Sequence, residues 1–449
     1  MKVEQVLKQQ IKIIKPSSET IKEIKTTTRD FVAHLEKKLK AKKIKADVFV
    51  GGSLAKNTIV KKDKYDVDIF IRFDKKYGDK EISKLLGKVV GKAKKVHGSR
   101  DYYQERVGEA IMEIIPVMKI KRQQQAQNIT DLSYFHVSYI NKHVNKNKKL
   151  ADEVILAKTF CHAQGCYGAE SYIHGFSGYA LELLICYYKS FNNFLKAVTS
   201  ISYKSFQKRF KQNTKKEAMK NRRLSSKSNK ISDNKIIIDI EKLYKNKEEI
   251  LRDLNKSKSH GPMILIDPTF KERNALAGLS WETFEKFKQV ASRFLKNPSD
   301  NFFKKKEIRG ELEKKYKNKL LVLNIKTTKQ PGDISGTKSK KFFEFFNRQL
   351  IREFQTQIAE FDYDEEKNIA YFFFIINKKK DEVIKGPPTS NKKHLAGFKK
   401  AHKNAFLKSG FACAKIKHDL SFNKWFELFK SKNKKIIKDM DVKSIGLGN

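Results

Sequence analysis

Residues 51–71 read GGSLAKNTIVKKDKYDVDIFI, and this stretch decides the fold that we expect. It opens on a Gly-Gly-Ser turn and closes on a segment in which Asp66 and Asp68 alternate with apolar residues. Successive side chains of a strand point to opposite faces, so the two carboxylates share one face while their apolar neighbours pack in a core. Residues 46–50, ADVFV, read as a strand that leads into the turn. The stretch therefore predicts two strands joined through a glycine turn, with two acids on one face.

The two parts of this stretch predict different binding roles. Like charges as close as Asp66 and Asp68 repel unless a cation lies between them, and Mg²⁺ prefers carboxylate oxygens together with substrate phosphates. In the turn, glycine lets backbone N–H groups approach phosphate oxygens, and the hydroxyl of Ser53 can donate to the same group. Glycine turns and solvated Asp-x-Asp strands are each common, so the prediction rests on their conjunction.

A strand, a Gly-Gly-Ser turn and an Asp-x-Asp strand in this order resemble the polymerase-β-type nucleotidyltransferase superfamily. The resemblance implies a third carboxylate on a neighbouring strand, and residues 111–117 read as an apolar strand with one acid, Glu113. An acid in that position is costly to bury unless it is paired or ligates a metal. We therefore expect Asp66, Asp68 and Glu113 to be catalytic and to hold two Mg²⁺ ions, which activate a 3′-hydroxyl and bind the leaving pyrophosphate.

Composition narrows the class of protein and of partner. The chain has 449 residues, with 97 Lys and Arg against 50 Asp and Glu, and its net charge of +47 favours a polyanionic partner. A biased composition or a merely solvated surface is the alternative source of that charge. Four scattered cysteines and the lack of a secretory signal pattern predict reduced thiols in the cytoplasm. The apolar runs are too short to span a bilayer, so we expect no membrane association.

The pattern along the chain predicts an α+β multidomain protein. Residues 1–150 carry the helix and strand patterns of the expected catalytic head, which would be polymerase-β-like by the resemblance. Residues 151–285 are mainly helical and form an expected neck, the nucleotide-binding domain. Within the neck, residues 204–230 hold 11 basic residues and a single acid, which reads as a basic insertion or a solvated loop.

Residues 286–449 form the expected α+β body and tail. Strands are predicted at residues 320–325 and 370–376, where apolar and β-branched residues cluster. Helices rich in Phe and Lys are predicted at residues 340–361 and 392–407.

Further segments resemble the class I, archaeal-type CCA-adding enzymes, which are tRNA nucleotidyltransferases. They are GSLAKNT at 52–58, SYFH at 133–136, DEVILAK at 152–158 with the Gly-rich run to residue 179, DPT and RNALA within 267–277, and GPP with FKKAH within 386–402. The resemblance spans nearly the whole chain. It implies nucleotide-binding roles for Gly52, Ser53, Lys56, Ser133, His136, Lys158, Tyr167 and Arg273.

The resemblance implies template-independent addition of C, C and A to the 3′ end of tRNA from CTP and ATP. Ser53 and Lys56 would bind the triphosphate, Lys158 and Tyr167 would reach phosphates and sugar, and Arg273 would contact the base edge. The C-terminal body and tail would grip the acceptor stem and TΨC arm by shape and phosphate contacts. The resemblance also implies a homodimer, a state that is common in the family.

Two features depart from the family pattern and keep alternatives open. Glu113 stands where the family usually has Asp, and residues 204–230 look inserted. One alternative is a poly(A)-type RNA-tailing nucleotidyltransferase, which would share the carboxylates and much of the phosphate site. The other is a catalytically weak RNA-binding protein on the same scaffold.

Overall fold

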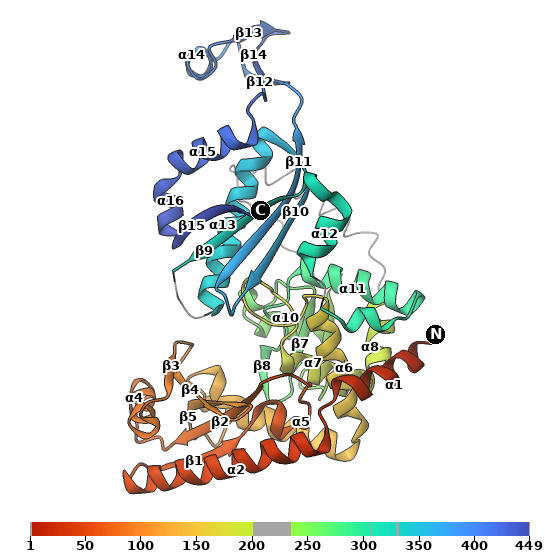
Figure 1. Ribbon diagram of the computed structural model, residues 1–449, viewed down its shortest axis with the longest axis vertical. Helices are drawn as coiled ribbons and strands as arrows, with labels where there is room; N and C mark the ends of the chain where they lie inside the picture. The colour runs from red at the N-terminus through yellow and green to blue at the C-terminus, as the bar shows by residue number, and fades with distance from the viewer. Residues whose placement is uncertain (1, 201–234, 306, 329–331, 449) are drawn as a thin grey trace. The chain divides into compact units, whose positions relative to one another are not determined.

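The computed structural model describes residues 2–200, 235–305, 307–328 and 332–448 (Figure 1). They belong to two compact units, Met1–Lys306 and Glu307–Asn449. The α+β fold class is confirmed, because helices and sheets occur in both units. The basic segment 204–230 lies outside the described residues.

The first unit contains, within the expected head, a five-stranded sheet of order β1-β2-β5-β4-β3. Helices α2 and α4 pack against the sheet, and their apolar residues share its core (Figure 1). The three strands predicted from sequence are confirmed as β1, β2 and β5, and β2 runs parallel to β5. The elements are α2 (Ser18–Ala41), β1 (Ala46–Val50), α3 (Gly52–Ala55), β2 (Tyr65–Phe73), α4 (Asp79–Val90), β3 (Lys94–Val96), β4 (Tyr102–Val107) and β5 (Ala110–Met118).

A second core of the first unit is built mainly from helices around phenylalanine side chains such as Phe160, Phe194 and Phe287, all fully buried, and it includes most of the expected neck. The N-terminal helix α1 (Val3–Ile14) packs in this core, although it precedes the head in sequence. The other elements are α5 (Ser133–Lys146), α6 (Lys149–Ala163), α7 (Gly178–Tyr188), α8 (Phe191–Thr199), β6 (Ile236–Asp239), α10 (Lys247–Asp253), β7 (Met263–Asp267), β8 (Phe270–Asn274) and α11 (Trp281–Lys296).

The division of the chain differs from the expected boundary between residues 285 and 286. That boundary lies inside α11, whose residues Phe284, Phe287 and Phe294 pack in the neck core, and the break between units follows Lys306. The apolar stripe of a helix indicates that one face is buried, but it does not indicate which domain covers it. A division of the first unit into head and neck stays a prediction.

The second unit contains a four-stranded sheet of order β10-β11-β9-β15 and a three-stranded sheet of order β12-β14-β13. Phenylalanines of α13 and α15, among them Phe342, Phe346 and Phe429, pack on the larger sheet. The elements are α12 (Ile308–Tyr316), β9 (Leu321–Thr327), α13 (Gly332–Glu353), β10 (Phe354–Asp364), β11 (Ile369–Lys378), β12 (Glu382–Pro388), α14 (Lys392–Ala401), β13 (Ala405–Lys408), β14 (Phe411–Ile416), α15 (Phe422–Lys432), α16 (Lys434–Asp439) and β15 (Val442–Gly448).

Two helices predicted in this unit extend too far. The prediction over 340–361 is wrong beyond Glu353, where the chain becomes strand β10 and pairs with β11. The prediction over 392–407 is wrong at its end, where β13 begins at Ala405. In both cases antiparallel pairing with the next strand along the chain outweighs the local helical pattern. No helix among the described residues is long and apolar enough to cross a membrane.

Candidate active site

The predicted carboxylates Asp68 and Glu113 lie side by side on two parallel strands. Asp68 of β2 pairs in register with Glu113 of β5. Val67 and Ile69, which flank Asp68, are completely buried on the opposite face, so the alternation read from the sequence is confirmed. Burial raises the pKa of Asp68, and burial together with the charge of Asp68 raises the pKa of Glu113 to about 7. A divalent cation between the two carboxylates would relieve this repulsion.

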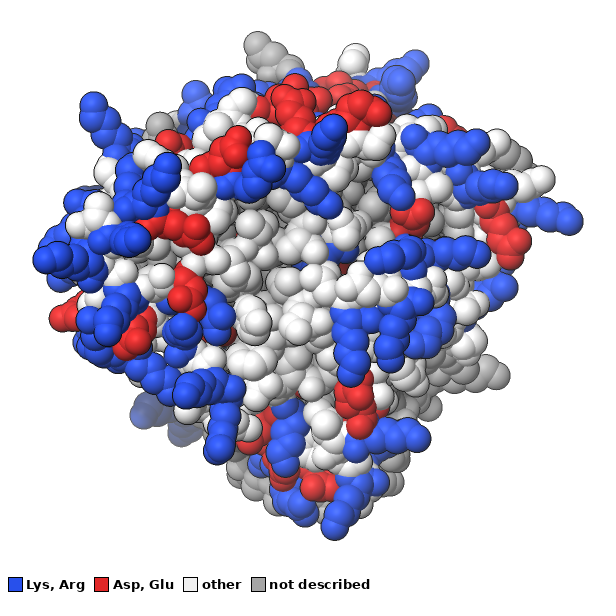
Figure 2. All heavy atoms as spheres, turned by 90° about the horizontal axis from the view of Figure 1, so that it is seen from below, with Lys and Arg blue, Asp and Glu red and all other residues white. Residues whose placement is uncertain are grey.

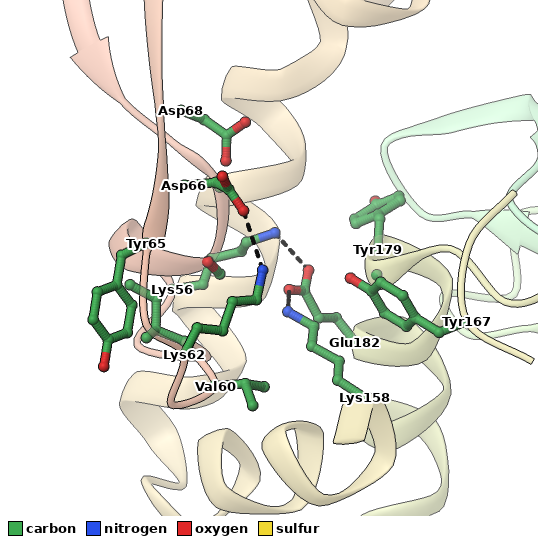
Figure 3. Close-up of a pocket in the computed structure, with 14 residues that line it drawn as sticks. Lys56, Val60, Lys62, Tyr65, Asp66, Asp68, Lys158, Tyr167, Tyr179 and Glu182 are labelled. Atoms are coloured by element: carbon green, nitrogen blue, oxygen red, sulfur yellow. Dashed lines mark hydrogen bonds and ion pairs between the residues drawn. The ribbon is translucent and has the colours of Figure 1, made fainter. Parts of the chain in front are cut away.

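Asp66 lies on the same strand as Asp68 but makes a different contact. Its side chain is 48% exposed, and its Oδ2 lies 3.1 Å from Nζ of Lys62 (Figure 3). Across the described residues, no three His, Cys, Asp or Glu side chains are gathered in a metal-ligating arrangement. The donor chemistry nevertheless fits Mg²⁺, because the carboxylates of Asp66, Asp68 and Glu113 lie on one face of two adjacent strands.

The turn needs glycine because it lies directly against β2. Gly52 has φ +60°, and a Cβ atom on it would stand 1.6 Å from Oδ2 of Asp68. A Cβ on Gly51 would stand 2.4 Å from the ring of Phe70. The N–H of Gly51 donates to the carbonyl oxygen of Asp68 at 2.8 Å. The glycines therefore allow the turn to lie directly against the strand that carries the acids.

A pocket of about 270 Å³ opens beside the turn and β2. Asp66 and Asp68 lie on one side of it and the rings of Tyr167 and Tyr179 on the other (Figure 3). The structure thus brings together most of the predicted nucleotide-binding residues. Those that line the pocket are Gly52, Ser53, Lys56, Lys158 and Tyr167.

Between the two sides, Glu182 of α7 holds two of these lysines. Its Oε2 lies 2.6 Å from Nζ of Lys56, and its Oε1 lies 2.8 Å from Nζ of Lys158 and 3.2 Å from Oγ1 of Thr58. Lys158 also donates to Thr58 at 3.0 Å. Burial opposes ionisation of Glu182, but the charges of Lys158 and Lys56 outweigh it and lower the pKa of Glu182 to about 2. Burial lowers the pKa of Lys158, and Glu182 counteracts that effect.

Ser133, His136 and Arg273 do not line the pocket. His136 and Arg273 instead meet at Asp267, whose Oδ2 lies 3.1 Å from Nε2 of His136 and 2.6 Å from Nη1 of Arg273. Burial lowers the pKa of His136, and the hydrogen bond and charge of Asp267 counteract that effect. Ser133 is the first residue of α5, one helical turn before His136.

Sequence reasoning missed Glu182, Asp267, Tyr179 and Lys62. A signal for Glu182 was present, because it is the sole charged residue in the helix GYALELLICYY. Asp267 is the last residue of a completely buried strand, MILID, and the sequence marks it only as the first residue of the DPT motif. Cys161, Cys166, Cys186 and Cys413 are free and buried, as expected for cysteines of a core.

Two protein-family models match the first 304 residues of this chain. A model described as tRNA nucleotidyltransferase, second domain, matches residues 152–304. A model described as Second Messenger Oligonucleotide or Dinucleotide Synthetase domain matches residues 1–150. Among solved structures, the chain is similar to one of the Cid1 poly(U) polymerase, which covers 67% of this chain with 14% identity and a TM-score of 0.47.

Several curated relatives carry one name. A CCA-adding enzyme of Nanoarchaeum equitans is 37% identical over 53% of this chain, but the match spans only 52% of that enzyme. A CCA-adding enzyme of Methanocaldococcus jannaschii is 28% identical over 90% of this chain and 86% of its own length. One of Methanococcus maripaludis is 26% identical over 91% of this chain and 87% of its own length. This chain is therefore similar to archaeal CCA-adding enzymes over most of its length, and to a tRNA nucleotidyltransferase domain over residues 152–304.

Proposed function

We propose that this protein adds C, C and A to the 3′ end of tRNA from CTP and ATP without a template and releases pyrophosphate. The observation that carries the proposal is the pairing of Asp68 with Glu113 beside a pocket that also contains Ser53, Lys56 and Lys158. Acids that suit metal ions and cations that suit a triphosphate thus lie within one site. Nucleotidyl transfer needs both groups together.

The pocket residues divide between the phosphates and the nucleoside. The hydroxyl of Ser53 and the ammonium groups of Lys56 and Lys158 would bind the triphosphate, and the absence of a side chain on Gly52 leaves the approach open. Each lysine ammonium has three donors, so Lys56 and Lys158 keep donors for phosphate oxygens while they are held by Glu182. The ring of Tyr167 would pack against the sugar.

Asp66, Asp68 and Glu113 would hold the two Mg²⁺ ions. When bound, these ions supply activation of the tRNA 3′-hydroxyl and neutralisation of the departing pyrophosphate. Until then Lys62 places a positive charge against Asp66, and this contact is exposed enough to exchange for another cation. Glu113 is one methylene longer than aspartate, so its carboxylate reaches further from the strand.

The base would be read near Arg273, His136 and Ser133. Arg273 only donates hydrogen bonds. A donor matches the unprotonated ring nitrogen that cytosine and adenine share, whereas uracil and guanine carry N–H at the corresponding position. A single arginine therefore suits the two nucleotides that the reaction needs.

The tRNA would be bound through its backbone. Figure 2 shows one face of the molecule, on which Lys and Arg side chains surround an area of mostly uncharged residues. A net charge of +47 favours phosphate contacts that do not depend on sequence. We place the acceptor stem and TΨC arm on the body and tail, and a homodimer stays a prediction.

One assay tests the proposal against its alternatives. The protein is incubated with Mg²⁺, CTP, ATP and tRNA that lacks its last three nucleotides, and the 3′ ends are sequenced. We expect CCA and no further growth, and intact tRNA serves as the control that should gain nothing. Long A-tails would instead identify a poly(A)-type enzyme. No addition at all would indicate an RNA-binding protein without the activity.

A further inference from the structure

Asp267 lies at the centre of a buried hydrogen-bond network beside the pocket. Its side chain is 0% exposed. Oδ1 accepts from the hydroxyl of Tyr179 at 3.0 Å and from the N–H and hydroxyl of Thr269 at 2.9 and 2.8 Å. Oδ2 accepts a hydrogen bond from Nη1 of Arg273 and is also within hydrogen-bond distance of Nε2 of His136. Burial would raise the pKa of Asp267, but these partners outweigh burial and hold that pKa well below its usual range.

The network joins three separate segments of the chain. His136 comes from α5, Tyr179 from the start of α7, and Thr269 and Arg273 from the hairpin of β7 and β8. The rings of His136 and Tyr179 are stacked, with centroids 4.0 Å apart and planes 26° from parallel. The guanidinium of Arg273 lies 5.6 Å from the centre of the Tyr179 ring. One carboxylate therefore fixes the position of three flat side chains at once.

The position of this network relative to the charged residues of the pocket indicates what it does. Asp68, Lys56 and Lys158 form the polar part of the pocket, whereas Tyr167 and Tyr179 form its far side (Figure 3). A nucleotide whose phosphates meet the lysines must direct its nucleoside toward the tyrosines. Tyr179 is the member of the Asp267 network that reaches this side of the pocket.

We infer that Asp267 is a positioning residue for base selection, holding Arg273, His136 and Tyr179 as a rigid wall that favours CTP and ATP over UTP and GTP. This inference rests on the proposed function. Hydrogen-bond donors reject a wrong base only when they cannot move to meet it. A buried network with every oxygen satisfied is rigid in this sense, and it costs no reorganisation when a nucleotide enters.

The test measures nucleotide preference in a complex that cannot react. The full-length protein is bound to tRNA that ends at the discriminator nucleotide in a 3′-deoxy sugar, and the dissociation constants of CTP and UTP are measured with Mg²⁺. Asp267→Asn keeps the shape but presents an NH₂ group to Arg273 or to Tyr179. We expect the wild-type preference for CTP to fall at least about tenfold in this variant, with weaker loss of CTP affinity itself.

Two further variants separate positioning from folding. Tyr179→Phe removes only the hydroxyl that donates a hydrogen bond to Asp267. The preference for CTP should therefore fall by a smaller factor than in Asp267→Asn, while the protein stays folded. Asp131→Asn is the matched control, because Asp131 is also a fully buried carboxylate paired with an arginine, Arg100, and it lies outside the pocket. It should lower thermal stability and leave the preference unchanged.

The possible results separate the role of Asp267 from the proposed function. Equal preference in wild type and Asp267→Asn, or no preference in wild type, would overturn the role of Asp267. A preference that depends on Asp267 in a protein that adds no CCA in the sequencing assay would overturn the proposed function alone. A preference lost equally in Asp131→Asn would show a general effect of destabilisation and would also overturn the inference.

Discussion

Gly52 and Asp68 approach so closely that no side chain fits between them. A Cβ atom on residue 52 would stand 1.6 Å from Oδ2 of Asp68 and 3.0 Å from its Cβ. The glycine also has a φ of +60°, a conformation that other residues adopt only at a cost. This one contact therefore sets the position of the turn relative to the strand that carries the acids.

This contact predicts the effect of Gly52→Ala. The new methyl group must displace the carboxylate of Asp68, and a displacement of an ångström at a reacting centre lowers kcat by about 100-fold. Gly108→Ala is the matched control, since Gly108 has φ +61° with nothing within 4 Å of its added Cβ. Both variants should lose about 1 kcal/mol of stability from backbone strain. Only Gly52→Ala should lose CMP incorporation, and equal activity in the two would argue against the contact.

Asp68→Ala should separate catalysis from tRNA binding. Loss of a metal-holding carboxylate removes several kcal/mol of transition-state stabilisation, so incorporation should fall by roughly 10³-fold. The tRNA affinity, measured by fluorescence anisotropy, should stay nearly unchanged because we expect it to come from lysines away from the carboxylates. Asp63→Ala removes an exposed acid just before the same strand and should change neither quantity. A parallel loss of affinity and activity in Asp68→Ala would contradict this division.

The strands of the site could be predicted because their signals are local. Alternation of Asp66 and Asp68 with apolar residues fixes β2, and a single acid in an apolar strand marks Glu113. The register of Asp68 with Glu113 could not be read, since neither residue specifies which position it faces. Their roles as metal ligands stay a prediction.

The remainder of the pocket depends on contacts between distant parts of the chain. Lys56 and Glu182 are separated by 126 residues, yet their charged atoms lie 2.6 Å apart. No local pattern indicates that pairing, and a resemblance gives roles to lysines without showing what holds them. The sequence predicts that the glycine turn admits phosphate oxygens, and the structure adds a second reason for glycine, because a Cβ on residue 52 would overlap the carboxylate of Asp68.

Glu182 predicts a pH dependence of stability. Its pKa is lowered from 4.5 to about 2, so its stabilising contribution is complete above about pH 4.5 and is lost as the pH falls through about 2. At neutral pH, Glu182→Gln should lower the free energy of unfolding by about 3 to 5 kcal/mol, because it leaves buried lysines without their counter-charge. Urea unfolding from neutral to acid pH should show this difference shrinking toward pH 2.

Glu153→Gln is the control for that measurement. Burial raises the pKa of Glu153, and its Oε2 accepts from the N–H of Phe191 at 2.7 Å, a bond that glutamine can keep. The substitution should therefore cost little at neutral pH. A difference between wild type and Glu182→Gln that stays constant across the acid range would show that the carboxylate charge is not what stabilises the pocket.

The second unit offers a test of how tRNA is bound. Lys434, Lys438 and Lys443 are exposed and line one groove between α16 and β15. If each contacts a phosphate, replacing all three by Gln should weaken tRNA binding and reduce the slope of log K against log salt by up to about 3, at roughly 0.9 for each contact. The triple Arg variant keeps the charges and should keep the slope. Anisotropy titrations over a series of KCl concentrations measure both, and an unchanged slope in the Gln variant would place the phosphate contacts on other lysines.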